Sequence, residues 1–318
     1  MGYSLLDLTR PDPNREPRVE WEETNCLLCG CDRWCPLVEA PDVTKGGSEL
    51  WFAVVQCQRC GLCFTNPRPT RPTIGRFYPP EYAPHQARPP RAETPWTKRL
   101  KKTLRGRETE RKVLPLQGKG RLLDFGCGGG SYLRRMHQQG WKVVGLDTSA
   151  AAVRRVRQGL GLPAFEGSLP CSDLPAGGFD VVTMWQVLEH VHDPLEVLRD
   201  AHRLLVPGGR LVLTVPNIDS LSFRLFGAWW YSLDLPRHLT HFTPSTLYQM
   251  LDRAGFRVGP IRMVRHSHWL RKSADLAHRQ RHIRTWQRWL RTKPGSRVMT
   301  WYGFLTQQSD CILANAER

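Results

Sequence analysis

The sequence of 318 residues lacks any long apolar run. No stretch reaches the roughly 18 consecutive apolar residues that a membrane-spanning helix needs. The first residues, MGYSLLDLTRPDPNREP, also lack the hydrophobic core of a secretory signal. These two absences predict a cytoplasmic protein that does not span a membrane.

Acidic residues are scarce relative to basic ones. The chain holds 46 Lys and Arg residues against 29 Asp and Glu residues, which gives a formal net charge of +17. Such an excess predicts an anionic partner: a nucleic acid, an acidic membrane surface or a phosphorylated substrate. The charge by itself does not choose among them. With 40% hydrophobic residues the chain can nevertheless bury a substantial core.

Seven of the ten cysteines lie in a short N-terminal segment. Two CxxC pairs, each followed by glycine, stand out there: Cys26 with Cys29, and Cys57 with Cys60. Glycine suits the tight turn of a knuckle whose backbone N–H groups point at thiolates. The spacing predicts a structural zinc ribbon with four thiolate ligands, and the alternative is redox-active or merely buried thiols. The spare cysteines, any of which could replace a ligand, are Cys31, Cys35 and Cys63.

The segment after the cysteines is rich in proline, which is incompatible with regular helix or sheet interiors and favours a semi-rigid linker. The stretch WTKRLKKTLRGRETERKVL then predicts a basic helix with a solvated face. We assign this linker and helix to residues 67–117. A zinc-ribbon-like domain at 25–66 precedes them, after an N-terminal tail at 1–24, and a larger domain follows at 118–318.

Strands and helices alternate from residue 121 onward. The near-continuous Val and Leu runs in RLLDF, KVVGLD, FDVVTMWQV and RLVLTVP are typical of a parallel sheet with helices on both faces. RVGPIRMV, residues 257–264, predicts the sixth strand. The C-terminal SDCILANAE predicts an antiparallel last strand. The expected fold class is therefore α/β.

A glycine-rich turn follows the first strand of this sheet. Asp124 is followed by Gly126, Gly128 and Gly130, and glycines allow backbone N–H groups to approach a ligand closely. Asp147 ends the second strand, where a carboxylate can accept both hydroxyls of a ribose. The glycines alone would also permit NAD. Asp124, which precedes them, suits an amino-acid ammonium group better than a pyrophosphate.

LLDFGCGGGSYL, VVGLDTS and FDVVTMWQVLEHVHDPLEVLRDAHRLLVPGGRLVLTVPN occur in an order that resembles class I S-adenosylmethionine-dependent methyltransferases. The resemblance covers residues 121–217 and implies a Rossmann-like sheet of seven strands with S-adenosylmethionine as cofactor. It also implies that Asp124 and the three glycines shape the methionine pocket and that Asp147 holds the ribose. The other cofactor-binding residues that it implies are Thr148, Ser168, Leu169, Trp185, Gln186 and His190. Glu189, next to His190, either lines the site or fixes the turn.

VVQCQRCGLCFTNPRP, FYPPEY and LPRHLTHFTPSTLYQMLDRAGF resemble a bacterial group that joins a small zinc-binding domain to this core. That group is associated with sugar, polysaccharide or secondary-metabolite biosynthesis. The resemblance implies a lid insertion at 217–243 and a small-molecule or glycan acceptor, including a nucleotide- or lipid-linked sugar, methylated at oxygen or carbon. In the lid, His238 and His241 are the candidate catalytic residues because imidazole exchanges protons near neutral pH. The alternative for both is a hydrogen bond that anchors the loop.

Arginines and tryptophans interleave over residues 262–297. Ile283, Trp286 and Leu290 lie there at helical spacing, which predicts a basic helical arm at 265–298. Such an arm either binds an anionic membrane surface, which would make the protein peripheral at the inner membrane, or packs on the core with a solvated outer face.

A nucleic-acid methyltransferase is the rival function, with RNA phosphates gripped by the zinc ribbon and the arm. Against it, WQVLEH lacks the Asn or Asp-Pro-Pro-aromatic signature expected for base-amine methylation. The sequence does not predict the oligomeric state.

Overall fold

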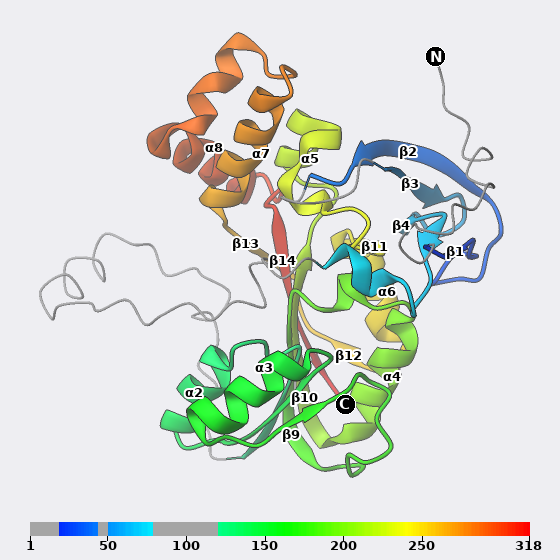
Figure 1. The fold of residues 1–318 in the computed structure, drawn as a ribbon, viewed down its shortest axis with the longest axis vertical. Coiled ribbons are helices and arrows are strands. Elements are labelled where there is room, and N and C mark those ends of the chain that lie inside the picture. Colours follow the sequence, from blue (N-terminus) through cyan, green and yellow to red (C-terminus); the bar gives the residue numbers. More distant parts are fainter. Residues whose placement is uncertain (1–18, 44–49, 79–119) are drawn as a thin grey trace, which may run out of the picture.

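A computed structural model of the chain describes residues 19–43, 50–78 and 120–318 (Figure 1). The basic helix predicted before residue 118 and most of the predicted N-terminal tail lie outside the described residues. None of the described helices is long and apolar enough to cross a membrane.

The large sheet has parallel strands at its centre and antiparallel strands at one edge. Its parallel strands are β6 (Arg121–Phe125), β7 (Lys142–Asp147), β8 (Ala164–Glu166), β9 (Phe179–Trp185) and β10 (Leu205–Pro216). β14 (Cys311–Glu317) runs antiparallel to β10. The order across the sheet is β12-β14-β10-β9-β6-β7-β8. The predicted α/β class is confirmed.

The predicted count of seven strands is wrong because the sixth strand is broken. It forms β12 (Arg257–Val258) and β13 (Arg262–Val264), which both pair with β14 and bring the sheet to eight strands. Pro260 lacks an N–H group for the ladder. Val258 pairs with Ala316 but Arg262 pairs with Leu313, so the broken strand holds one extra residue, as at a β-bulge.

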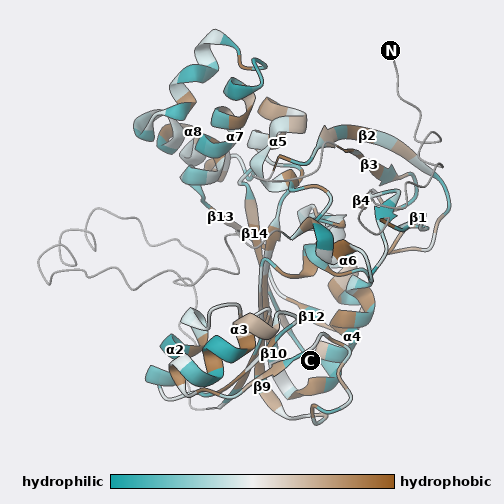
Figure 2. Ribbon diagram, viewed as in Figure 1, coloured by the Kyte–Doolittle hydropathy of each residue, from teal (hydrophilic) through white to brown (hydrophobic). Residues whose placement is uncertain are grey.

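Helices cover both faces of the large sheet and explain its continuous apolar runs. They are α2 (Ser131–Gln138), α3 (Ala150–Arg154) with its π-helical continuation η5 (Arg155–Gly159), α4 (Pro194–Leu204) and α6 (Pro244–Arg253). Leu122 packs in one apolar cluster with residues of α2 and α3, whereas its neighbour Leu123 packs in the other with residues of α4 and α6. Figure 2 shows these apolar strands at the centre of the molecule. α4 ends at Leu204 because Leu205 already pairs with Phe179 of β9.

A smaller sheet holds the N-terminal residues. β2 (Trp34–Pro41), β3 (Trp51–Cys57) and β4 (Cys63–Thr65) form it together with β11 (Thr240–His241), in the order β11-β4-β3-β2. β11 comes from the predicted lid, so a segment of the large domain completes the N-terminal sheet. Beside it, β1 (Trp21–Glu22), from the end of the predicted tail, pairs with β5 (Arg68–Pro69).

The predicted lid and arm form the remaining helical layer. The lid contains α5 (Leu221–Phe226), η7 (Gly227–Trp229) and η8 (Tyr231–Leu233). The arm contains α7 (Ser267–Arg279), η9 (Thr285–Arg291) and α8 (Lys293–Leu305), and α8 extends the arm beyond its predicted end at residue 298. Figure 1 shows α7 and α8 beside α5, at the end of the molecule away from α2 and α3. Three consecutive aromatic residues of the lid pack against other parts of the chain. Trp230 is buried, Trp229 stacks on His282, and Tyr231 lies against Trp269.

Candidate active site

The glycine turn lies at the carboxyl end of β6. Gly126, Gly128 and Gly130 all have positive φ, between +52° and +73°, a conformation that side chains disfavour. A Cβ atom on Gly126 would lie 2.3 Å from Cγ2 of Val187, so a larger residue would not fit. Asp124, just before the turn, is buried, and its Oδ1 accepts a 2.7 Å hydrogen bond from the hydroxyl of Thr183.

Asp147 faces this turn from the end of β7. Its Oδ2 accepts a hydrogen bond from the backbone N–H of Gly128, and its Oδ1 accepts one from that of Ser149, both at 2.8 Å. Each carboxylate oxygen can accept more than one hydrogen bond, so both keep capacity for a hydroxyl. The arrangement of turn and carboxylate fits a ligand that carries a ribose.

The other predicted cofactor-binding residues differ in their surroundings. Thr148 and Ser168 are exposed, whereas Leu169 is buried in the core beneath α4. The indole of Trp185 packs against Tyr132 at 5.0 Å between ring centroids. Among the described residues its Nε1 has no hydrogen-bond partner. The Gln186 amide donates to the hydroxyl of Thr214 on β10.

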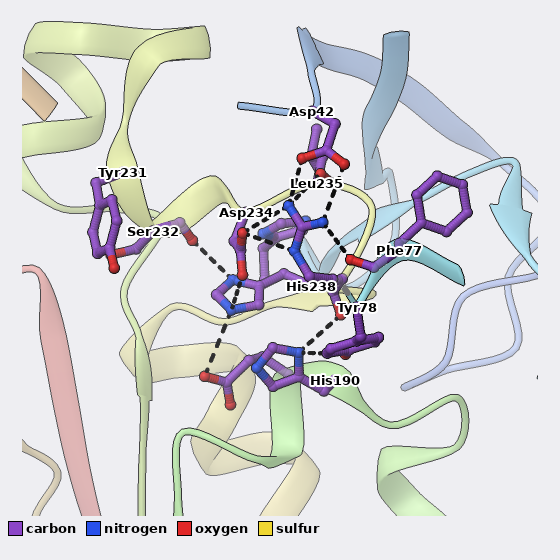
Figure 3. A network of polar contacts seen from close by, with 12 residues as sticks. Asp42, Phe77, Tyr78, His190, Tyr231, Ser232, Asp234, Leu235 and His238 are labelled. Atoms are coloured by element: carbon purple, nitrogen blue, oxygen red, sulfur yellow. Dashed lines mark hydrogen bonds and ion pairs between the residues drawn. The ribbon is translucent and has the colours of Figure 1, made fainter. Parts of the chain in front are cut away.

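A second set of polar groups gathers after β9, as Figure 3 shows. Glu189 and His190 belong to η6 (Leu188–His190), and His238 comes from the lid. One ligand atom from each of the three lies within 4.8 Å of the other two. The ring centroids of His190 and His238 are 4.5 Å apart. A carboxylate and two imidazoles thus converge at the end of the sheet where ligands bind in this class of fold.

The contacts of His238 define which of its nitrogens can accept a proton. Nδ1 lies 2.9 Å from the carbonyl oxygen of Ser232. A carbonyl only accepts, so Nδ1 carries the hydrogen of the neutral ring and Nε2 carries the lone pair. Nε2 lies 4.0 Å from Oε1 of Glu189 and 3.8 Å from Oδ2 of Asp234, both longer than a hydrogen bond.

Burial, helped by the positive charge that His190 can carry, lowers the pKa of His238 well below 6.5, although Asp234 opposes this shift. His238 is therefore a neutral imidazole at neutral pH. Burial raises the pKa of Asp234, but the charge of Arg237 and its hydrogen bond to the carboxylate outweigh that effect and bring the pKa to about 2. Asp234 is therefore ionised beside His238.

Arg237 ties the lid to the N-terminal sheet. Its guanidinium is fully buried and donates to both carboxylate oxygens of Asp42, at 2.6 and 3.1 Å, and to Asp234 at 3.0 Å. It also donates to the carbonyl of Phe77 at 2.7 Å. These partners make Arg237 a structural link and argue against its binding a substrate phosphate.

Sequence reasoning missed the partners that the N-terminal segment supplies. Asp42 follows β2, and Tyr78 follows η2 (Ile74–Phe77). The Tyr78 hydroxyl lies 3.0 Å from Nδ1 of His190, and burial raises the pKa of that phenol, which keeps it protonated. In the sequence, Tyr78 belongs to FYPPEY, which served only as part of the resemblance to a bacterial group. No local pattern pairs it with His190.

His241 has a different environment from His238. It belongs to β11 opposite Cys63, and its Nε2 lies 3.2 Å from the hydroxyl of Thr65. That hydroxyl donates to the carbonyl of His238 at 2.7 Å. Burial lowers the pKa of His241 from 6.5 to about 3. The geometry favours His241 as a support for the backbone of His238.

This burial predicts a pH effect on stability. The unfolded chain binds a proton on His241 below pH 6.5, whereas the folded chain resists it until about pH 3, so acidification favours unfolding. Relative to His241→Gln, we expect the wild-type free energy of unfolding to fall by about 1.4 kcal/mol for each pH unit below 6.5. Urea unfolding from pH 7 to pH 4 measures both slopes. Equal slopes would show that the pKa of His241 is the same in the folded and the unfolded chain.

The four cysteines of the CxxC pairs meet in the structure. Their Sγ atoms all lie within 4.8 Å of one another, with Cys26 and Cys60 at 3.4 Å and Cys29 and Cys57 at 3.6 Å. Burial raises the pKa of Cys57, but backbone N–H groups of Cys60 and Arg59 and the neighbouring thiols outweigh it and lower the pKa to about 6. A compact cluster of four sulfurs fits a zinc ion.

The two knuckles have matching backbones. The N–H of Gly30 donates to the carbonyl of Cys26, and that of Gly61 donates to the carbonyl of Cys57, with both glycines at positive φ. Among the described residues, the spare cysteines Cys31, Cys35 and Cys63 are not part of the cluster. The first knuckle also contacts α6, since Arg253 donates to the carbonyl of Leu28 at 2.7 Å.

Comparisons with known proteins bear on this arrangement. The methyltransferase domain family matches residues 96–259, just over half of the chain. Over 154 residues the chain is 39% identical to a ubiquinone biosynthesis O-methyltransferase of Cereibacter sphaeroides, an alignment that covers 45% of this chain and 62% of that protein. A Pseudomonas aeruginosa protein of the same name is 36% identical over 159 residues, covering 46% of this chain and 68% of that protein. The chain thus spans slightly less than two thirds of the first relative.

The solved structures to which the chain is similar include an S-adenosylmethionine dependent methyltransferase from Mesorhizobium loti. It has 22% identity and a TM-score of 0.46, and the match covers 66% of this chain and 95% of that one. A SAM dependent methyltransferase from Archaeoglobus fulgidus has 18% identity and a TM-score of 0.46, with 70% and 94% covered. By the family match over more than half of its length, the chain belongs to the methyltransferase domain family.

Proposed function

We propose that this enzyme methylates a hydroxyl oxygen of a small-molecule acceptor held beside His238. The observation that carries the proposal is the neutral, buried imidazole of His238 next to Glu189 and His190 after β9. When bound, S-adenosylmethionine supplies a methyl group on a positively charged sulfur, which an acceptor atom displaces. An oxygen acceptor fits the printed names of the two relatives, which are O-methyltransferases.

His238 is suited to remove the hydroxyl proton of the acceptor. Its Nε2 lone pair takes the proton, while Nδ1–H donates to the Ser232 carbonyl and fixes the ring. The imidazolium that results lies near the ionised carboxylate of Asp234, whose Oδ2 is 3.8 Å from Nε2. Opposite charges at this distance favour the protonated ring, so they stabilise the charge as it develops.

The lid aromatics do not support a sugar as the acceptor. Trp229 stacks on His282, Trp230 packs against Phe223, and Tyr231 lies against Trp269. The positions of these three rings give no exposed stacking platform over the site. A labelled-methyl transfer assay with phenols, nucleotide sugars and an RNA oligonucleotide tests the acceptor class. We expect an O-methyl product from the small hydroxyl compounds. Transfer only to carbon, or only to RNA, would contradict the proposal.

Asp147 and the glycine turn are the residues that would hold the cofactor. Asp147→Ala removes two ribose acceptors, so we expect calorimetry to show roughly tenfold to hundredfold weaker S-adenosylmethionine binding. Asp147→Asn keeps one acceptor, so its affinity for S-adenosylmethionine should lie between those of the wild type and Asp147→Ala. Exposed Asp173→Ala is the matched control and should bind as the wild type does. Unchanged affinity in a folded Asp147→Ala protein would remove the ribose assignment.

We infer that the cysteine cluster binds one structural zinc ion through Cys26, Cys29, Cys57 and Cys60. In a tetrahedral site with zinc–sulfur bonds of about 2.3 Å, the sulfurs lie about 3.8 Å apart. The two measured pairs, at 3.4 and 3.6 Å, are close to that spacing. Four thiolates leave zinc no open position, which supports a role in folding and argues against one in methyl transfer.

A further inference from the structure

The arm exposes its apolar side chains. α8 presents Val298, Trp301, Tyr302 and Leu305 outward, at positions i, i+3, i+4 and i+7, so they share one face of the helix. The fully buried residues of α8 are small, namely Gly295, Ser296, Thr300 and Gly303, and Met299 packs against the arm beside them. This distribution reverses that of a surface helix of a water-soluble protein, in which the large apolar residues face the core.

η9 adds two tryptophans to this surface. Trp286 and Trp289 are three residues apart, one turn of a 3₁₀ helix, and both are about half exposed. A Cβ atom on Gly295 would lie 2.3 Å from the carbonyl oxygen of Trp289, so η9 and α8 are in close contact. Of the three apolar residues that lie at helical spacing in the sequence, Leu290 is fully buried and Ile283 packs inward, whereas Trp286 is about half exposed.

We call Trp286, Trp289, Val298, Trp301, Tyr302 and Leu305 the aromatic surface. Its members are exposed by 48% to 72%, and they make up six of the eleven large hydrophobic residues that are exposed in the described part of the chain. Six such residues within twenty positions mark an interaction site.

Positive charge surrounds the aromatic surface. Residues 262–305 contain eleven Lys and Arg residues against one acidic residue, Asp275, for a net charge of +10. Asp275 is paired with Arg291 at 2.7 Å. The guanidinium of Arg265 lies 3.4 Å from the ring centroid of Trp301, so a cation borders the apolar stripe directly.

We propose that the aromatic surface docks on an anionic phospholipid bilayer. Trp and Tyr side chains favour the level of the lipid headgroups, aliphatic side chains enter the acyl boundary, and Arg and Lys pair with lipid phosphates. A second copy of the chain is a poorer occupant, because its residues 262–305, with a net charge of +10, would repel those of the first copy. A nucleic acid would match the charge but would leave Val298 and Leu305 without an apolar partner.

The docking surface is joined to the lid that carries His238. The hydroxyl of Ser273 on α7 accepts from the N–H of Tyr231, and Lys272 donates to the Tyr231 hydroxyl, both at 2.9 Å. Ser232, the next residue, holds Nδ1 of His238. Docking thus brings the lid near the bilayer and favours an amphiphilic acceptor, an extension that rests on the proposed function.

Vesicle co-sedimentation of the full chain tests the docking, without acceptor or turnover. We expect binding to phosphatidylglycerol-containing vesicles, weakening with salt, and little binding to pure phosphatidylcholine. Trp301→Ser with Leu305→Ser should weaken binding by roughly tenfold or more, since the indole would be lost from the headgroup level and the leucine side chain from the acyl boundary. Trp51→Ser is the matched control, because Trp51 is equally exposed but lies on β3. Circular dichroism checks that each variant is folded.

Three results would overturn the proposal. One is equal vesicle binding by the wild type and the double variant. Another is filter binding to an RNA oligonucleotide, without vesicle binding, that the double variant loses. The third is a dimer in light scattering that the double variant converts to a monomer. Because these measurements use no methyl acceptor, failure of the docking is distinguishable from failure of the proposed chemistry.

Discussion

His238→Ala is expected to reduce methyl transfer by roughly 10²- to 10⁴-fold, the usual contribution of a positioned general base. The hydroxyl proton of the acceptor would have no imidazole Nε2 to accept it. S-adenosylmethionine affinity should not change, because Asp147 and the glycine turn lie on other elements. Single-turnover kinetics measures the first effect and calorimetry the second. Transfer at the wild-type rate would show that His238 is not the base.

Two companion variants separate the base from its surroundings. His238→Asn can keep a hydrogen bond to the Ser232 carbonyl but cannot act as the base, so it should be as slow as His238→Ala while leaving less of a cavity. His241→Gln should keep most of the activity, because His241 contacts Thr65 rather than the Glu189 and His190 side of the site. Equal losses in His238→Asn and His241→Gln would indicate a purely structural role for both histidines.

The pH dependence of kcat/KM in the wild-type enzyme tests the protonation state of His238. An imidazole with an ordinary pKa would lose half of its base form at pH 6.5. Burial and His190 lower the pKa of His238 well below that value. We therefore expect kcat/KM to stay level from pH 7.5 through 6.5 and to fall only at lower pH. A decline centred at pH 6.5 would show that the free enzyme holds an ordinary imidazole.

Cys57→Ser with Cys60→Ser is expected to release the zinc ion and to unfold the N-terminal sheet. Structural zinc contributes about 10–16 kcal/mol to the folding of small zinc domains, which equals or exceeds the stability of a typical domain. The double variant removes one whole knuckle and half of the ligands. Metal analysis should find about one zinc per wild-type chain and none in the variant. Exposed Cys35→Ser is the control and should keep its zinc.

Loss of the knuckle should also lower methyl transfer, although no cysteine lies in the second polar set. β11 pairs with β4, and Asp42 holds Arg237 at 2.6 Å, so the N-terminal sheet supports the lid segment that carries His238. Thermal unfolding followed with activity tests this link. A zinc-free variant with full activity would show that the two sheets are independent. A wild-type protein without zinc would remove the metal assignment.

Local sequence was sufficient for the features that depend on neighbouring residues. The CxxCG spacing predicted both knuckles because the turn closes within five residues and needs glycine at positive φ. The glycine turn after β6 and the carboxylate at the end of β7 follow for the same reason. Runs of Val and Leu predicted a sheet that is buried on both faces, because a strand covered on both sides is apolar at consecutive positions of its own sequence.

Contacts between distant segments could be decided only by the tertiary structure. Asp42 and Arg237 are 195 positions apart, and Tyr78 and His190 are 112 apart, so no periodicity in the sequence relates them. The direction of α8 is a similar case. Helical spacing groups Val298, Trp301, Tyr302 and Leu305 on one face, but only packing against α7 and η9 turns that face outward. The sequence by itself determined the methyltransferase family, the cysteine knuckles and the α/β class. Tertiary packing decided the environment of His238 and the exposed surface of the arm, because these depend on which elements meet.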